Sequence, residues 1–459
     1  MNKDVSTLTF QGETGRDEFQ REQIADKVIT LLTSDIDVSP MVIDGNWGTG
    51  KTEFCHKLIN KFKKSHPNYH ILYVDAFQAD HADDPLMTIL AEVLNILPEG
   101  DKKEGLISKA MPVLRYGFKT ALKAGANHIL RANSDDIADG LDKYIQDAAD
   151  TAIDASVMAV LKDHEKAKEN LEALQQILGE LAKEKPIIIF IDELDRCRPD
   201  FSVQMLEVIK HTFDVEGVQF VLVTNTTQLK AAINHRYGGT SIDAKRYLDK
   251  FLKFSFCLPD FVPRSGYSRN KTLSSITHFD NQVSKSTILQ NTEFNNRNYQ
   301  VNNFVDTLIT INKLSLREVE AFVRSIEIFY KLGNSIGTSM YSGESFLRIF
   351  GIFIFCFESD IEESIRSSKT DAVQITKLLG INPKPESHVE RYELSDVGII
   401  AIILGSACSK KEYFYHLTEN DNEKKRAEVT LRLFGESSME GKYVFDFIME
   451  AIDALSLGV

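Results

Sequence analysis

A short stretch of glycines followed by a lysine and a threonine has the composition and spacing needed to hold a phosphate chain. Residues 45–52 read GNWGTGKT and satisfy the pattern GxxxxGK[ST] in full. Glycines let the backbone curl so that successive N–H groups point at phosphate oxygens. Lys51 would bring a positive charge to the β- and γ-phosphates, and the Thr52 hydroxyl is a hard oxygen ligand suited to Mg²⁺. We predict that this loop binds a nucleoside triphosphate, taken to be ATP, through Gly45, Asn46, Trp47, Gly48, Thr49, Gly50, Lys51 and Thr52.

The alternative is a glycine-rich turn that fits the pattern by chance. A short apolar run at 41–43 and a helical pattern after the loop favour the phosphate-binding interpretation, because this motif needs a strand before it and a helix after it. Trp47 is the only tryptophan. Since it belongs to the phosphate end of the site, we expect it to pack beside the loop and not to stack on a base.

Two carboxylates follow the most apolar strand of the chain. Residues 187–191 read IIIFI, and Asp192 and Glu193 come directly after them, as in a Walker B segment. Successive strand residues point to opposite faces, so the two side chains take different roles. Asp192 is predicted to bind Mg²⁺, and Glu193 to orient and polarise the attacking water. A solvated strand end is the alternative for such a pattern alone, but the phosphate loop upstream favours the functional reading.

The next apolar strand, 218–224, ends at Asn225. A polar residue at this strand end could hold the water or sense the γ-phosphate, and Asn225 is our candidate. The alternative is an asparagine that forms a turn.

Strand and helix patterns alternate through the first half of the chain. The expected strands are 41–43, 70–77, 186–191, 218–224 and 253–258, and helical patterns lie between them. The central strands are continuous apolar runs, which is typical of a parallel sheet covered on both faces. The sequence therefore predicts an α/β fold.

The domain organisation follows from shifts in composition. Residues 99–165 look like a helical insertion. It is either a solvated insert packed on the core or, as the alternative, a face that docks on a partner or makes peripheral contact with a membrane. Residues 260–303 are polar and rich in asparagine, which indicates a surface loop. The pattern from 304 onward is mostly helical. We predict an NTPase core in two parts, 1–98 and 166–259, interrupted by the insertion 99–165 and followed by the loop region 260–303 and a helical domain, 304–459.

Composition limits the classes of function. The net charge of −14 over 459 residues argues against nucleic-acid binding by bulk electrostatics. The five cysteines contain no CxxC pair, which fits a reducing compartment. The N-terminus lacks the apolar region of a signal peptide, and no apolar run reaches the roughly 20 residues that a spanning helix needs. We expect a cytoplasmic protein without transmembrane helices.

Together these segments resemble the KAP family of P-loop NTPases. The resemblance covers roughly residues 14–330 and rests on GNWGTGKT, VDAFQADHADDPL, IDELDRCRPD, the RYG and YLDK stretches at 236–238 and 247–250, and LREV at 316–319. Phe77 departs from the family's usual tryptophan, and Leu316 replaces its proline. The resemblance implies a three-layer sandwich of the additional-strand catalytic-glutamate type, a soluble member, and a bacterial setting such as phage exclusion or defence.

The resemblance also suggests which cations complete the site. Arg317 looks like the arginine that such NTPases place against the γ-phosphate, with a surface helix arginine as the alternative. Arg196, Arg198, Arg246 and Lys250 are further candidates for positioning the nucleotide or for a finger acting in a neighbouring copy, which would make the protein a homo-oligomer.

Three functional hypotheses follow. The first is an ATPase whose hydrolysis drives conformational change or assembly with partner proteins. The second is a nucleotide-gated scaffold with little turnover. The third is a P-loop kinase, which the Asp192-Glu193 pair argues against, because a water-polarising glutamate does not help a kinase.

Overall fold

The computed structural model describes residues 5–11, 15–82, 84–96, 172, 174–238, 243–263, 271–294, 299–336, 343–381, 396–410 and 443–457. These residues form two compact units, Met1–Leu258 and Pro259–Val459. The predicted helical insertion at 99–165 lies outside the described residues.

The described part of the first unit is built on a parallel sheet of five strands in the order β2-β3-β4-β1-β5. The strands are β1 (Met41–Asp44), β2 (His70–Asp75), β3 (Ile187–Asp192), β4 (Val218–Thr224) and β5 (Phe254–Cys257). The strand before the phosphate loop, β1, pairs with β4 and β5, so β4 separates it from the acidic strand β3. This arrangement confirms the predicted additional-strand α/β fold.

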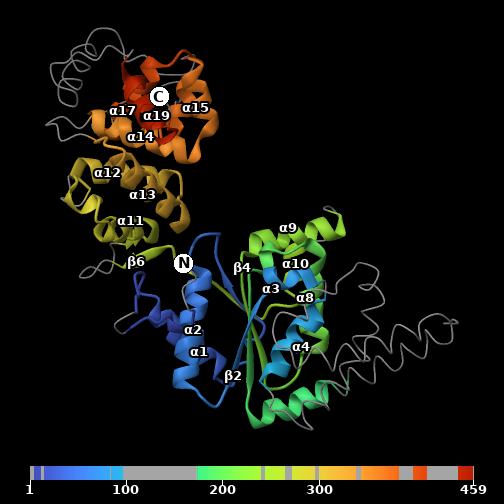
Figure 1. The fold of residues 1–459 in the computed structure, drawn as a ribbon. Helices are drawn as coiled ribbons and strands as arrows, with labels where there is room; N and C mark the ends of the chain where they lie inside the picture. The colour runs from blue at the N-terminus through green and yellow to red at the C-terminus, as the bar shows by residue number, and fades with distance from the viewer. Residues whose placement is uncertain are drawn as a thin grey trace. The chain divides into compact units, whose positions relative to one another are not determined.

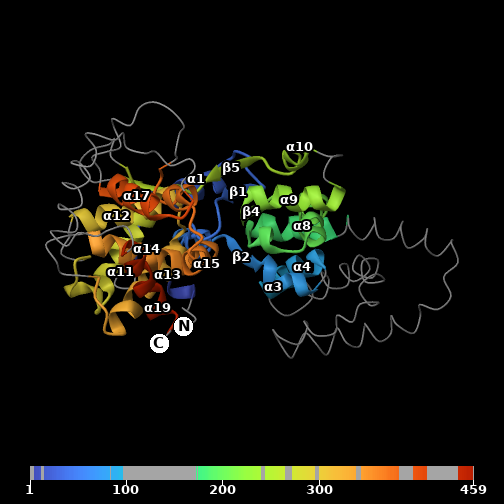
Figure 2. The same ribbon diagram turned by 90° about the horizontal axis from the view of Figure 1, so that it is seen from above.

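Helices cover both faces of the sheet (Figures 1 and 2). Alternate strand residues enter two separate cores, as the period of a strand requires. Ile188 and Phe190 pack with α1 and α2, whereas Ile187, Ile189 and Ile191 pack with the helices of the opposite face. Among the described residues, the α-helices of this unit include α1 (Glu22–Leu32), α2 (Lys51–Ser65), α3 (Ala76–Ala79), α4 (Pro85–Asn95), α8 (Pro199–Thr212), α9 (Thr226–Tyr237) and α10 (Ala244–Leu248).

The described part of the second unit is mainly helical, as predicted. Its α-helices are α11 (Ser274–Lys285), α12 (Tyr299–Ile311), α13 (Leu316–Lys331), α14 (Gly343–Phe357), α15 (Ser359–Arg366), α16 (Ala372–Lys377), α17 (Asp396–Ala407) and α19 (Val444–Leu455). Helix α14 carries one of the longest apolar runs of the sequence and is buried within this unit. Among the described helices, none is long and apolar enough to cross a membrane.

The polar region 260–303 is not simply a surface loop, and that prediction was wrong. It contains a two-stranded antiparallel sheet of β6 (Phe261–Pro263) and β7 (Lys271–Leu273), followed by α11. Although the region is polar overall, α11 has a narrow apolar stripe. Ile276, Phe279 and Val283 recur at helical spacing and pack into the core of the second unit.

Gly351 lies where α14 meets α19, and we predict that any side chain added there would destabilise the fold. A Cβ atom there would lie 2.5 Å from the backbone oxygen of Ile448. Alanine favours a helix by about 1 kcal/mol over glycine, but forcing two backbones apart costs about 1–3 kcal/mol. We expect Gly351→Ala to lower the free energy of unfolding in a denaturant titration, and an unchanged or higher value would contradict this close packing.

Candidate functional site

The phosphate loop connects β1 to α2, and its backbone is curled where the glycines stand. Gly48 and Gly50 have φ angles of 76° and 80°, in the left-handed region that glycine enters without a Cβ clash. Gly50 is also the N-cap of α2. The loop therefore runs directly into the positive end of a helix, which is a favourable place for an anion.

Two residues that the sequence analysis did not single out hold this loop. The Asp44 carboxylate accepts hydrogen bonds from the Gly45 amide (2.8 Å), the Thr226 amide (2.9 Å) and the Thr226 hydroxyl (2.7 Å). The buried Arg21 side chain donates to the Thr49 carbonyl at 2.9 Å. No motif marks either residue, because both contacts depend on how α1 and α9 sit against the loop.

The Lys51 ammonium lies inside the loop. Its Nζ donates to the Gly45 carbonyl at 2.7 Å and to the Asn46 carbonyl at 3.0 Å. Burial lowers the pKa of Lys51, while the carboxylates of Asp195, Asp192 and Asp44 act in the opposite direction. Lys51 is thus placed where its charge can meet a phosphate group.

The two predicted metal ligands, Thr52 and Asp192, lie together. The Asp192 carboxylate accepts hydrogen bonds from the Glu193 amide (2.8 Å) and the Tyr73 hydroxyl (3.3 Å), and the Thr52 side chain lies close enough to lower its pKa. Asp192 is buried, and burial raises its pKa to about 6. A hydroxyl and a carboxylate fit Mg²⁺, which prefers oxygen ligands and completes its shell with water and substrate phosphates.

Glu193 turns sharply away from the strand that carries Asp192. Its φ of 59° is left-handed, a conformation that costs a residue with a side chain about 1–2 kcal/mol. The Glu193 carboxylate forms an ion pair with Arg196 at 3.0 Å. Arg196, one of the candidate cations, therefore contacts the predicted water-activating carboxylate.

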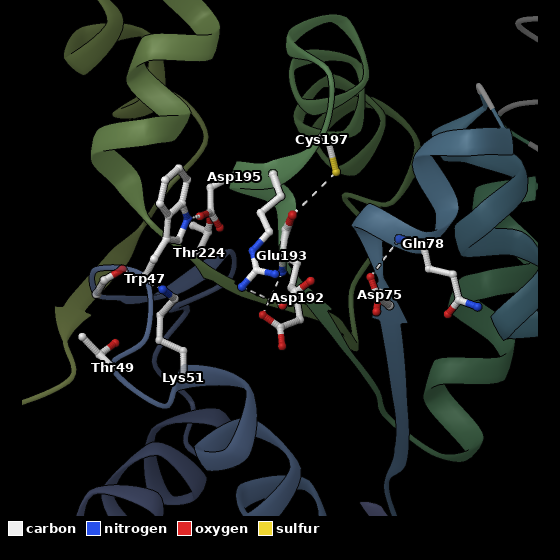
Figure 3. Close-up of polar contacts among 12 residues, drawn as sticks. Trp47, Thr49, Lys51, Asp75, Gln78, Asp192, Glu193, Asp195, Cys197 and Thr224 are labelled. Carbon is white, nitrogen blue, oxygen red and sulfur yellow. Dashed lines mark hydrogen bonds and ion pairs between the residues drawn. The ribbon is translucent and has the colours of Figure 1, made fainter. Parts of the chain in front are cut away.

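Asp195 joins the loop to the sheet. One carboxylate oxygen accepts from the Trp47 indole N–H at 2.5 Å, and the other accepts from the Thr224 hydroxyl at 3.0 Å. Figure 3 shows Trp47 and Lys51 of the loop gathered with Asp192, Glu193 and Asp195. Trp47 has 49% of its surface exposed, and its expected packing beside the loop stays a prediction.

Asn225 takes the turn-forming role that was its alternative. Its side-chain oxygen accepts from the Thr227 amide (3.0 Å) and the Gln228 amide (3.3 Å), so it caps the N-terminus of α9. These contacts do not test a sensing role, which stays a prediction. In this structure the polar strand-end residue bonded into the site is Thr224, which the sequence analysis missed.

The remaining candidate cations have other contacts. Arg198 donates from its side chain to Asp80 at 3.1 Å, which ties the segment after β2 to the start of α8. Arg246 is exposed and pairs with Asp243 at 3.4 Å. The Lys250 carbonyl accepts a hydrogen bond from the Lys210 side chain at 2.8 Å. Arg317 lies in the first turn of α13, in the second unit, and its role stays a prediction.

The comparison with protein families agrees with this geometry. The model of the KAP family P-loop domain matches residues 21–333, more than half of the chain. The chain belongs to the KAP family of P-loop NTPases. The predicted family is therefore confirmed over nearly the range that the resemblance covered.

More distant comparisons add little to the family assignment. No curated protein matches this KAP NTPase. A solved structure of the ORC2 protein of Aeropyrum pernix, in ADPNP–ADP complexes, is similar with a TM-score of 0.35 and 11% sequence identity, over 95% of this chain and 85% of that one. A likeness this distant says nothing about which partner this chain uses.

Proposed function

We propose that this KAP NTPase binds ATP with Mg²⁺, hydrolyses it, and couples hydrolysis to conformational change or assembly with partner proteins. The observation that carries the proposal is that the Thr52 side chain and the Asp192 carboxylate lie together, next to a loop that holds Lys51. Two residues 140 positions apart in the sequence (192 − 52) thus form the pair that a nucleotide-bound cation needs.

The residues of the site would have different roles, which follow from their positions. The loop amides and the Lys51 ammonium would contact the β- and γ-phosphates. Thr52 and Asp192 would hold Mg²⁺, which when bound neutralises phosphate charge. Glu193 would accept a proton from the attacking water, since its carboxylate lies directly after the metal-binding aspartate.

A nucleotide-gated scaffold with little turnover is the second candidate, and one contact favours it. The Glu193 carboxylate is occupied by Arg196 at 3.0 Å, and a carboxylate paired with a cation is a weaker base. In this case ATP would bind, but hydrolysis would wait until Glu193 is released.

Steady-state phosphate release with saturating Mg²⁺ and ATP separates the two candidates. Sustained turnover supports the ATPase, whereas binding with negligible release supports the scaffold. Arg196→Ala sharpens the test. If the ion pair restrains Glu193, this variant raises turnover severalfold without changing ATP affinity. A fall of about tenfold or more would instead assign Arg196 to the stabilisation of phosphate charge.

The pKa of Asp192 predicts a pH dependence. Burial raises this pKa to about 6, so the side chain becomes neutral as the pH falls through that value. Because a metal ligand must be deprotonated, the Mg²⁺-dependent part of ATP affinity should fall by about tenfold per pH unit well below pH 6. Titrations of Mg²⁺ into protein and ATP at several pH values measure this. Asp192→Asn should remove the pH dependence, and a wild-type affinity that stays constant down to pH 5 would contradict it.

From the family resemblance we propose that the protein acts with other proteins and with a second copy of itself, which supplies an arginine in trans. The setting proposed is phage exclusion or defence. A finger acting in trans makes turnover per molecule rise with protein concentration. Turnover should be measured both at concentrations at which the protein is a monomer and at higher concentrations. The same turnover per molecule throughout would reject the trans arrangement.

A further inference from the structure

The Asp195 carboxylate bridges two parts of the site that are far apart in sequence. It accepts one hydrogen bond from the indole of Trp47, in the phosphate loop, and one from the hydroxyl of Thr224, at the end of β4. Figure 3 shows Trp47, Asp195 and Thr224 gathered at the same place in the site. Hydrogen bonds to an ionised acceptor are stronger than those between neutral groups.

The Trp47 end of the bridge is attached to the loop backbone that would wrap a phosphate. Trp47 immediately precedes Gly48, whose φ of 76° forms part of the curl. About half of the indole is exposed, so packing alone does not fix it. The hydrogen bond to Asp195 therefore contributes to setting the position of this part of the loop.

The Thr224 end is anchored in the sheet. Thr224 is fully buried and lies opposite Asp44 in the pairing of β4 with β1. Asp44 in turn binds the amides of Gly45 and Thr226. Asp44 thus holds the start of the loop at Gly45, and Asp195 holds it at Trp47. Both carboxylates also contact the segment in which β4 ends and α9 begins.

We infer that Asp195 is a positioning residue of the nucleotide site, which couples the phosphate loop, through Trp47, to the end of β4 and the start of α9. This inference rests on the proposed binding of ATP. A movement of the loop around a phosphate group would pull on Asp195 and, through it, on Thr224. Asp195 makes no contact with the reacting atoms in this role.

Removing the carboxylate provides a test. Asp195→Ala deletes both acceptor oxygens, so the Trp47 indole N–H and the Thr224 hydroxyl both lose their partner. Trp47 is the only tryptophan of the chain, so its emission reports this contact directly. We expect Asp195→Ala to shift the emission of the nucleotide-free protein and to weaken ATP binding about tenfold.

A second substitution distinguishes a positioning role from loss of structure. Asp195→Asn can still form the bridge, because its amide oxygen can accept from the Trp47 indole while its NH₂ group donates to the Thr224 hydroxyl. It should therefore keep the emission of the nucleotide-free protein and the ATP affinity close to those of the wild type. Asp75→Ala is the matched control for Asp195→Ala, because Asp75 ends β2 but binds the Gln78 amide at 2.9 Å, away from Trp47. It should leave the emission unchanged.

Affinity measured by equilibrium dialysis with labelled ATP completes the experiment. Trp47→Phe and Asp195→Ala should together weaken binding no more than the stronger of the two alone. The inference is overturned if their fold-changes multiply, or if Asp195→Ala leaves the emission as it is in the wild type. If the wild-type protein binds ATP no better than Lys51→Ala, the proposed function fails instead, while the emission of the nucleotide-free variants still reports on the bridge.

Discussion

Replacing Lys51 with alanine is expected to abolish ATP turnover and to weaken ATP binding by about a hundredfold or more. The ammonium lies 2.7 Å and 3.0 Å from two carbonyl oxygens of its own loop, so it is already positioned where phosphate oxygens would arrive. A hydrogen bond to a charged group contributes about 1.5–3 kcal/mol, and Lys51 would form more than one with a triphosphate. Equilibrium dialysis and phosphate release measure the two effects.

Lys64→Ala is a suitable control for this experiment. Lys64 belongs to the last turn of the same helix, α2, and is exposed, so its loss removes a charge without touching the loop. It should bind and turn over ATP as the wild type does. Full activity in Lys51→Ala, with an unchanged thermal unfolding profile, would refute the assignment of the phosphate loop.

Replacing Glu193 with glutamine is expected to separate binding from hydrolysis. Glutamine has the same shape but cannot take a proton from water, and general-base catalysis contributes about 10²–10⁴ in rate. We expect phosphate release to fall by at least about a hundredfold while ATP affinity stays within a few-fold of the wild type. Single-turnover experiments with pre-bound ATP measure the chemical step directly.

The same variant can identify partners. A protein that holds ATP without hydrolysing it stays in its nucleotide-bound form, so proteins that bind this form should be enriched with Glu193→Gln and ATP over the wild type. Glu216→Gln is a control of equal chemistry on an exposed residue. Turnover by Glu193→Gln at the wild-type rate would mean that another group activates the water.

The prediction of elements from sequence succeeded where one pattern dominates. Strand β3 is buried along its whole length and is a continuous apolar run, so both its type and its place inside the sheet follow from hydrophobicity. It failed in 260–303, where polar residues outnumber apolar ones. There the few apolar side chains of α11, such as Phe279 and Val283, gain their importance only from what they pack against.

The sequence by itself determined the local chemistry of the site. The curl of residues 45–52 depends on glycines within a single loop, and the positions of Lys51, Thr52 and Asp192 follow from the ends of adjoining elements. Only the tertiary structure decided the partners of these groups. Trp47 meets Asp195 across 148 positions of the chain, Arg21 binds the Thr49 carbonyl across 28 positions, and Asp44 binds the Thr226 amide across 182 positions. Such contacts are set by strand order and helix packing, which depend on the whole core and leave no spacing in the sequence to read.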